Sequence, residues 1–592
     1  MPNESAEAVR LHLLSRDYEA ALAVARSATE LEPAARHRLE RMALARAGRF
    51  AEAAAAGREV LASEIAEPED YFRLAEIVLR SGDPVEALAA GLRAVQQCPD
   101  VIRYLVPVVQ AVLLQPALES TLRRGLSPLD NGLPPPRHER GDKVCLPVDL
   151  PHYQPLEGAH PWVMGLVGAA GEIGFLRQSP EVGNLAAAIL AALPRALALT
   201  EQLSRIHPLV TRQEAAAYIA LRFPAALYGA EGAGVDLLPF APMSLIERPF
   251  VMVFDVIGNI FSPPMPFEDT QVDSRRTAHY WIMRAVLEAP ACLAVVTNYR
   301  EVAPLLGGFF GSARIAEKCV FVNPVTSLDE MADAAGARDA TAVEKLPGAK
   351  LTLLFTSSMN WRNETFYIRG GVDVLNAFLD LAERYPQLHL VFRSRLPDNL
   401  SPRLREAVAT HPRIRWLTGF VPWEEYRQIL TEADLFVMPS VLPYRNGLTQ
   451  AMRWGIVPVI GDCMHAHEVL DSGATGIVVP GRGFRAVVSA TDQRYCGDWI
   501  DVLRATDHPA DRAFFERYRA TLEGLIRDPS RIAEMRRNLR AAPSRHSYGP
   551  ADGERFSATL AAAIKAAPSI DLSPGTVFPI QPLIRPGSLI DA

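Results

Sequence analysis

The segment from Asp434 to Val459 places a turn and a helix start directly behind a buried strand. Residues 434–440 form a short apolar run, which is typical of a strand covered on both faces. A turn follows, and Leu448, Ala451 and Met452 then recur at helical spacing. The free backbone N–H groups and the positive dipole end at the start of this helix can bind a diphosphate.

Residues 350–480 alternate regularly between strands and helices, and this alternation must position the helix start. Expected strands cover 351–358, 389–394, 414–420, 434–440 and 457–462, with helices between them. Short connections of this kind predict a doubly wound parallel sheet, in which ligands lie at the carboxyl ends of the strands.

Residues 146–340 show a less regular alternation. Helices are expected at 184–205 and 275–287, and strands at 249–258, 292–299 and 319–325. The pattern predicts a second α/β layer, whose strand order the sequence leaves open.

Three motifs of the regular region carry a family resemblance. They are residues 413–440 (RIRWLTGFVPWEEYRQILTEADLFVMPS), 447–462 (GLTQAMRWGIVPVIGD) and 467–479 (HEVLDSGATGIVV). In order and spacing they resemble the donor-binding half of retaining glycosyltransferases of the large family 4 type. The resemblance covers about 130 residues, 350–480. It implies a GT-B fold of two Rossmann-like domains, with residues 146–340 on the acceptor side.

The resemblance also implies roles for individual residues on the donor side. Arg369 stands where the family has a lysine that neutralises the departing diphosphate. Arg393 ends a strand and is a second candidate cation, or a surface ion-pair partner. Glu468 matches a family glutamate near the nucleotide, although an acid in the first turn of a helix needs no ligand to explain it. The further donor-binding candidates are Ser440, Asn446, Gly447, Leu448 and Gln450.

The chain departs from the family at its paired glutamates. Leu442 and Gln450 occupy those two positions. A glutamine can still accept a hydrogen bond from a hydroxyl, whereas a leucine cannot bond a sugar. Either other groups, such as Tyr444 or Arg445, bind an unusual sugar, or donor binding is impaired.

Candidates on the acceptor side are Asp255, Asn259 and His279. Asp255 and His279 are predicted catalytic residues together with Arg369, although a lone histidine beside Tyr280 is more often simply packed. Retaining transfer depends more on positioning the substrates and on electrostatic stabilisation of the leaving group than on acid–base catalysis by the protein.

We expect neither a metal nor a resident cofactor. His465 and His467, with Asp462 and Cys463 nearby, do not form a convincing metal set. The nucleotide sugar is then the substrate of a metal-independent enzyme.

The first 115 residues carry a repeat. Turns at 16–20, 48–53 and 82–87 recur at intervals of 32 and 34 residues. This period is typical of tetratricopeptide (TPR) helix pairs, which present a concave face to a protein segment. An alanine-rich helical bundle would also supply the small residues, but three turns in phase favour the repeat.

The predicted organisation is therefore TPR-like helical repeats at 1–115, a linker at 116–145, an acceptor-side Rossmann-like domain at 146–340, a nucleotide-sugar-binding domain at 341–500, and helices with an extended tail at 501–592. The fold class is α/β of the GT-B type, preceded by an all-α region.

Composition limits the functions further. The net charge is -7, which gives no general attraction to nucleic acid or anionic membrane. The six cysteines lack CxxC spacing, and no stretch is long and apolar enough to span a membrane. We expect a cytoplasmic protein, at most peripheral at the inner membrane.

These features together predict a glycosyltransferase that uses a nucleotide sugar. Its acceptor is a protein recruited by the repeats, since the organisation resembles bacterial flagellin-modifying glycosyltransferases. Two alternatives remain: a transferase of surface polysaccharide or lipid-linked glycan, and a catalytically degenerate GT-B scaffold.

Overall fold

The structure is a computed structural model of the 592-residue chain. It describes residues 4–14, 17–135, 141–146, 161–177, 183–228, 230–239, 244–254, 272–325, 348–357, 364–419, 421–441, 445–463, 466–482, 486–488, 494–497, 502, 505–541, 549–573 and 577–578.

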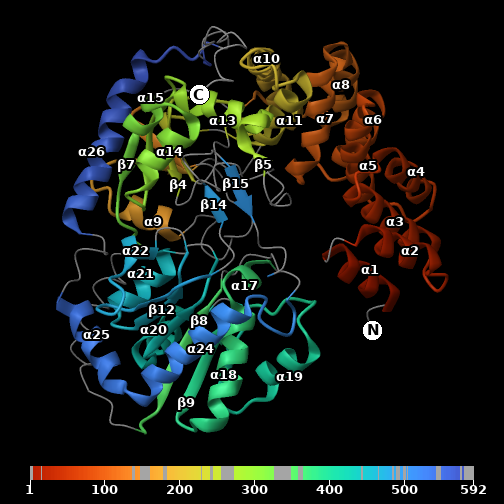
Figure 1. Cartoon of the computed structure of the whole chain (residues 1–592). Coiled ribbons are helices and arrows are strands. Elements are labelled where there is room, and N and C mark those ends of the chain that lie inside the picture. The colour runs from red at the N-terminus through yellow and green to blue at the C-terminus, as the bar shows by residue number, and fades with distance from the viewer. Residues whose placement is uncertain are drawn as a thin grey trace, which may run out of the picture.

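The C-terminal half is built on a parallel sheet of six strands in the order β10-β9-β8-β11-β12-β13 (Figure 1). Its strands are β8 (Leu351–Thr356), β9 (Leu388–Arg393), β10 (Ile414–Leu417), β11 (Leu435–Met438), β12 (Val457–Gly461) and β13 (Ile477–Val479). Numbered along the chain this order is 3-2-1-4-5-6, that of a dinucleotide-binding Rossmann sheet. Every residue of β8, β11 and β12 is buried, so helices cover both faces.

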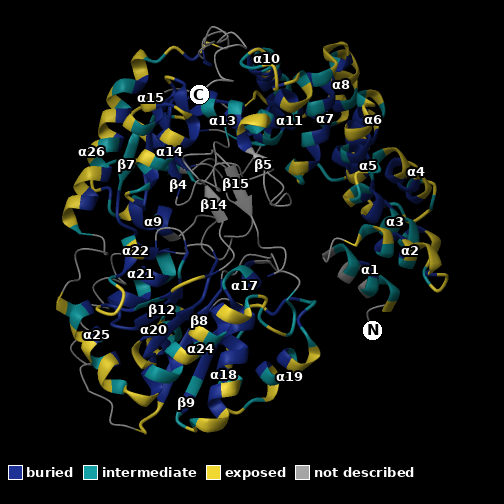
Figure 2. Ribbon diagram, in the orientation of Figure 1, coloured by how far each residue is buried: buried dark blue, intermediate teal, exposed yellow. Residues whose placement is uncertain are grey.

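The helices of this half alternate with its strands, as the sequence predicts. They are α17 (Glu364–Ile368), α18 (Gly371–Arg384), α19 (Pro402–Thr410), α20 (Trp423–Glu432), α21 (Arg445–Arg453) and α22 (Ala466–Val469), followed by α24 (Arg512–Arg527) and α25 (Pro529–Ala541). Figure 2 shows their inward faces buried and their outward faces exposed.

A second parallel sheet of six strands, in the order β2-β1-β3-β4-β6-β7, forms the N-terminal half. Its strands are β1 (Lys143–Leu146), β2 (Phe175–Arg177), β3 (Ala233–Pro239), β4 (Phe250–Phe254), β6 (Cys292–Thr297) and β7 (Cys319–Phe321). The helices of this half are α9 (Pro161–Gly168), α10 (Leu185–Leu203), α11 (Arg212–Arg222), α13 (Ala278–Glu288), α14 (Val302–Phe310) and α15 (Ala313–Glu317). Two Rossmann-like domains in one chain make a GT-B fold, as expected.

The two faces of the N-terminal sheet belong to different cores. Along β4, Val251 and Val253 join a core that includes Trp162 of α9, whereas Phe250 and Met252 join the main core. The first core also contains Phe556 of α26 (Pro550–Ala566), the last long helix of the chain. Helix α26 therefore returns from the C-terminal half to cover the N-terminal sheet (Figure 1).

A small antiparallel sheet contains segments from both halves. Its order is β14-β15-β5, where β14 is Ala486–Val488, β15 is Arg494–Gly497 and β5 is Val272–Asp273.

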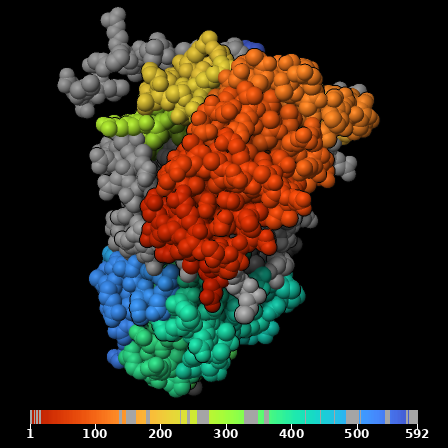
Figure 3. Space-filling view, turned by 90° about the vertical axis from the view of Figure 1, so that its right-hand side faces the viewer, coloured from red at the N-terminus to blue at the C-terminus, as the bar shows by residue number. Residues whose placement is uncertain are grey.

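The N-terminal region is all-α, and its helices come in antiparallel pairs. The pairs are α1 (Glu4–Leu14) with α2 (Tyr18–Ser27), α3 (Pro33–Arg46) with α4 (Phe50–Leu61), and α5 (Pro68–Ser81) with α6 (Pro84–Gln97). The three repeated turns each lie between the helices of one pair, and Gly48 and Gly82 adopt the positive φ that two of them need. Ala21, Ala53 and Ala87 are fully buried at equivalent positions, so the region has the TPR-like repeat architecture. Figure 3 shows its surface on one side of the molecule.

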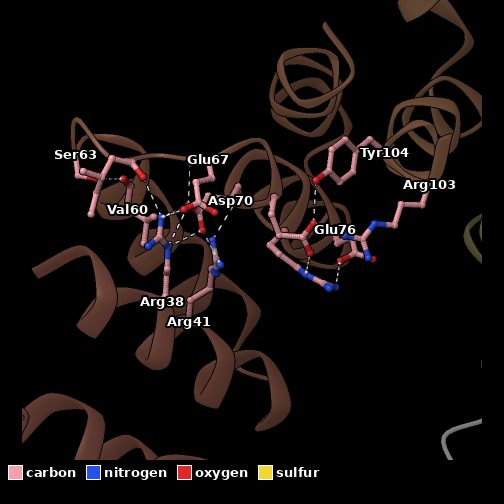
Figure 4. Close-up of polar contacts among 12 residues, drawn as sticks. Arg38, Arg41, Val60, Ser63, Glu67, Asp70, Glu76, Arg103 and Tyr104 are labelled. Carbon is pink, nitrogen blue, oxygen red and sulfur yellow. Dashed lines mark hydrogen bonds and ion pairs between the residues drawn. The ribbon is translucent and has the colours of Figure 1, made fainter. Parts of the chain in front are cut away.

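Ion pairs join successive helix pairs, and the one at Asp70 is largely buried (Figure 4). Asp70 on α5 accepts hydrogen bonds from Arg38 at 2.6 Å and from Arg41 at 3.1 Å, both on α3. Burial alone would raise the pKa of Asp70, but the bond from Arg38 and the charge of Arg41 lower it below its usual value. On the next pair, Arg103 and Tyr104 both bind Glu69.

A linker was expected at residues 116–145, but its first part, residues 116–129, continues the helical region. After α7 (Leu105–Leu114) come α8 (Glu119–Leu126) and a 3-10 helix (Ser127–Leu129). Leu118, Leu122 and Leu126 are buried in the main core. Helix α11 packs on α7, and α10 on α11, so the array joins the N-terminal half through packed helices (Figure 1).

No stretch was expected to be long and apolar enough to span a membrane, but helix α10 meets that test by length and composition. However, just over half of its apolar window is buried, and its Arg195 donates hydrogen bonds to the carbonyls of Leu245 and Leu572. These contacts are those of a core helix.

Candidate functional site

The carboxyl ends of the two sheets meet. Arg445, the first residue of α21, donates a 2.9 Å hydrogen bond to the side chain of Asn323, which follows β7. Arg453, at the other end of α21, binds the carbonyl of Pro324 at 2.5 Å. Ligands of doubly wound sheets lie at this edge, so the candidate site lies where the two halves touch.

The start of α21 lies over the end of β8. A Cβ on Gly447 would lie 3.8 Å from both Thr356 of β8 and Phe436 of β11. Leu448 and Thr449 are buried at the same helix start. The Oδ1 atom of Asn446 is buried without a hydrogen-bond partner in the described part of the chain. The predicted helix start is therefore positioned against the central strands, and it offers backbone N–H groups there.

Arg369 reaches the same strand end, because its Nη1 donates a 3.2 Å hydrogen bond to the Thr356 carbonyl. The following Gly370 has φ +81°, and a Cβ there would lie 2.7 Å from the Pro439 carbonyl. Ser440, next to that proline, donates from its Oγ to the Ile368 carbonyl at 3.1 Å. Arg369, Ser440 and Gly447 thus lie around the ends of β8 and β11.

Arg393 and Gln450 are joined through one tyrosine. The Arg393 guanidinium lies 4.9 Å from the centre of the Tyr426 ring. The hydroxyl of Tyr426 donates to Oε1 of Gln450 at 3.2 Å. The side chain of Gln450 can therefore accept a hydrogen bond, as the glutamate of the family can. In this structure its acceptor atom binds Tyr426 of the protein.

Glu468 contacts the other half of the molecule. Its carboxylate accepts hydrogen bonds from the backbone N–H groups of Arg300 at 2.6 Å and Glu301 at 3.0 Å, just before α14. The adjacent His467 pairs with the Glu301 side chain at 2.7 Å. In this structure Glu468 therefore caps a helix, which is a use that the family resemblance did not suggest.

His279 is a packed histidine. Its ring lies edge-on to Tyr218 at 6.2 Å. Burial, with the nearby charge of Arg222, lowers its pKa to about 4. An imidazole with so low a pKa is a weak base, which argues against the predicted catalytic role of His279. Asp255 and Asn259, and likewise Leu442, Tyr444 and His465, lie outside the described residues.

Sequence reasoning named Arg445 as a candidate sugar-binding group, but it did not predict that this residue reaches across the interface. Arg445 is only 2% exposed and lies between the rings of Tyr299 and Phe321. Asn323, its partner, is held in turn by Asp552 of α26. The one available signal was the arginine at the start of an amphipathic helix, where a basic residue opposes the dipole and so needs another reason.

Within the described residues, no group of three or more histidine, cysteine, aspartate or glutamate side chains could hold a metal ion. The cations of the site are arginines, which bind phosphate directly.

Comparison with known proteins gives one family match. Residues 350–495 match the family described as Glycosyl transferases group 1. No curated protein matches the chain.

Solved structures give weaker likenesses. A mutant O-GlcNAc transferase from Thermobaculum terrenum is 14% identical, over 96% of this chain and 100% of that one, with a TM-score of 0.33. HepE from Anabaena, in complex with UDP and glucose, is 13% identical, over 71% of this chain and 99% of that one, with a TM-score of 0.40. The catalytic domain of starch synthase IV from Arabidopsis thaliana, bound to ADP and acarbose, is 12% identical, over 57% and 74%, with a TM-score of 0.33.

TM-scores of this size carry no conclusion about the substrate of this chain, and the fold rests on its own two sheets. The family match covers the sheet that carries α21, Arg369 and Arg393. The chain therefore contains a glycosyl transferases group 1 domain at residues 350–495.

Proposed function

We propose that the protein is a glycosyltransferase that transfers a sugar from a nucleotide-sugar donor bound at the carboxyl edge of β8 and β11. The observation that carries this proposal is the convergence of Arg369, Ser440 and the start of α21 on those two strand ends. A diphosphate there meets a cation and a set of free backbone N–H groups.

The chemistry that suits these groups is a retaining, metal-independent transfer. As the bond between the sugar and the diphosphate breaks, negative charge grows on the leaving phosphate. Arg369 and the α21 dipole stabilise that charge, and the leaving phosphate can take the acceptor proton itself. No resident cofactor is needed for this step.

We further propose that the acceptor is a protein and that the helical repeats recruit it. The array is joined to the N-terminal half through α7, α11 and α10, so it is held on the half that receives the acceptor in a GT-B enzyme. A repeat surface fixed in this way can deliver a bound protein segment to the interface between the halves.

The donor half of the proposal is tested by ligand-induced thermal stabilisation of the full chain. A panel of UDP, GDP, ADP, CDP and TDP, with their sugars, should raise the melting temperature for at least one nucleotide, because a ligand selective for the native state stabilises it. No rise with any of them would refute donor binding and favour a scaffold.

The acceptor half needs a separate test in cells. Removal of residues 1–64, which cuts between two helix pairs, should abolish glycosylation of the protein acceptor while the thermal response to the nucleotide persists. Unchanged protein glycosylation would refute recruitment by the repeats.

A further inference from the structure

Arg445 is a buried cation whose hydrogen-bonding capacity is mostly unused. It is 2% exposed, and its Nη2 donates to Asn323. Its Nε and Nη1 have no hydrogen-bond partner in the described part of the chain. Unpaired polar atoms at this depth are rare, because each one loses its bonds to water without replacement.

The charge of Arg445 is also poorly compensated. No described carboxylate forms an ion pair with it, although Glu468 and Asp552 act on it from a greater distance. Burial lowers the pKa of Arg445 to about 10, so the group stays charged at neutral pH. The rings of Tyr299 and Phe321, at 5.1 and 5.6 Å, offset only part of the cost of burying a charge.

The position of the guanidinium is fixed from behind. The backbone N–H and the side-chain amide of Asn323 both donate to Asp552, at 3.2 and 3.1 Å. These bonds orient the amide so that its oxygen faces Arg445. Helix α26 thus holds the arginine in place through Asn323.

Other buried polar groups without a partner in the described chain lie near the carboxyl ends of the two sheets. Neither side-chain amide atom of Asn298, which follows β6 and is 1% exposed, has a partner in the described chain. Asn446 and Thr449 on α21 each bury an oxygen without a partner among these residues. Buried groups from both halves are therefore left unsatisfied around the start of α21, as in a binding site that lacks its ligand.

We propose that Arg445 is a donor-binding residue, which uses its unpartnered N–H groups to bind an anionic oxygen of the nucleotide sugar. The inference rests on the proposed function and extends it. The oxygen belongs to the diphosphate or to a carboxylate on the sugar, since a guanidinium binds both in the same manner. Because Arg445 is held by Asn323 and Asp552, donor binding also engages the N-terminal half.

The competing explanation is that Arg445 merely packs the interface, and stability separates the two. An arginine kept for a ligand costs stability when the ligand is absent, so Arg445→Gln should melt at or above the wild-type temperature. It should also weaken binding of the stabilising nucleoside diphosphate by ~10- to 100-fold, the loss expected for a charge-assisted hydrogen bond. Arg445→Lys keeps the positive charge but loses the planar guanidinium. Its affinity for the nucleotide should lie between those of the wild type and Arg445→Gln.

Calorimetry on the full chain tests these expectations. The matched control is Arg482→Lys, because Arg482 is also 2% exposed and has two unpartnered nitrogens, but pairs with Asp373 at 3.0 Å. The control should leave nucleotide affinity unchanged.

The arms distinguish the source of the anion. If Arg445→Gln weakens binding of the nucleoside diphosphate without any sugar, Arg445 binds phosphate. If the substitution weakens binding of UDP-glucuronic acid and leaves binding of UDP-glucose unchanged, Arg445 binds a sugar carboxylate. A variant that melts lower and binds every nucleotide like the wild type overturns the inference alone. Failure of the wild type to bind any nucleotide overturns the proposed function with it.

Discussion

The carboxylate of Glu468 accepts a 2.6 Å hydrogen bond from the backbone N–H of Arg300, so an acid of one half caps a helix of the other. We expect Glu468→Ala to lower the free energy of unfolding by ~1–2 kcal/mol, the usual effect of losing a helix cap. Glu468→Gln, which keeps one acceptor, should lose less. Urea unfolding followed by circular dichroism measures both, with Glu432→Ala on α20 as a control.

The same variants separate two roles for Glu468. A cap changes stability and leaves nucleotide affinity nearly intact. Normal stability with lost nucleotide binding would instead show that this carboxylate binds the ligand, as the family resemblance implies.

Arg369 should matter for turnover more than for folding. Its guanidinium is held by the Thr356 carbonyl at the strand end where the leaving phosphate is proposed to lie. Arg369→Ala should reduce kcat by ~10²- to 10³-fold, the effect typical of losing one group that stabilises developing charge. Arg369→Lys should recover part of it. Steady-state transfer or donor hydrolysis measures this, and Arg384→Ala, which breaks an ion pair with Glu523 and a contact with the Tyr385 ring, is the control. An unchanged kcat in Arg369→Ala would exclude this role.

Asp70 should stabilise the helical array. Arg41, one of its two partners, is itself buried, so Asp70→Ala leaves a charge without its counterion and should cost ~3–5 kcal/mol. Glu119→Ala, which removes an exposed pair with Arg123, should cost less than ~1 kcal/mol. Equal effects of the two variants in urea unfolding would contradict this prediction.

The pH dependence of Asp70 has a definite sign. Its folded-state pKa is lowered, so its contribution is complete above the unfolded pKa of ~3.9. That contribution is lost as the pH falls through the folded value. Acid unfolding of Asp70→Asn should therefore be less steep than that of the wild type below that pH.

His279 should affect the pH dependence of stability and not the chemistry. Its pKa is about 4 in the folded protein against ~6.5 in the unfolded chain, so the unfolded state binds the extra proton between these values. Stability should fall as the pH drops from ~6.5 to ~4, and His279→Phe should remove that part of the fall. The pH profile of kcat should be unaltered. A shifted kcat profile would return His279 to the list of catalytic residues.

The C-terminal sheet could be predicted from the sequence, because its central strands β8, β11 and β12 are fully buried and their apolar runs are unambiguous. The run expected at 351–358 is β8 (Leu351–Thr356), and that at 457–462 is β12 (Val457–Gly461). The strand order of the N-terminal half could not be predicted from the sequence. Strands β1 and β2 are short, and long segments of chain separate β1 from the strands with which it pairs. The helical part of the expected linker, residues 116–129, was missed for a related reason: α8, which carries Leu122 and Leu126, packs on α6 and on the distant helix α10.

The candidate site divides in the same way. The helix start at Gly447 follows from local spacing, as does the cation at Arg369. The burial of Arg445 does not follow from local spacing. Its partner Asn323 is 122 residues away in sequence, and Asp552, which holds Asn323, lies on the last long helix. Only the complete fold brings these three side chains together.

The return of α26 to the N-terminal sheet has a consequence for how the protein is made. Val144, Val235 and Val253 pack in one core with Phe556 and Leu560 of that helix. During synthesis the ribosome releases the N-terminal strands first and α26 only after the whole C-terminal half has been translated. Until then α9 covers this face of the sheet without α26, so the first half completes its core only after its neighbour has had the chance to fold.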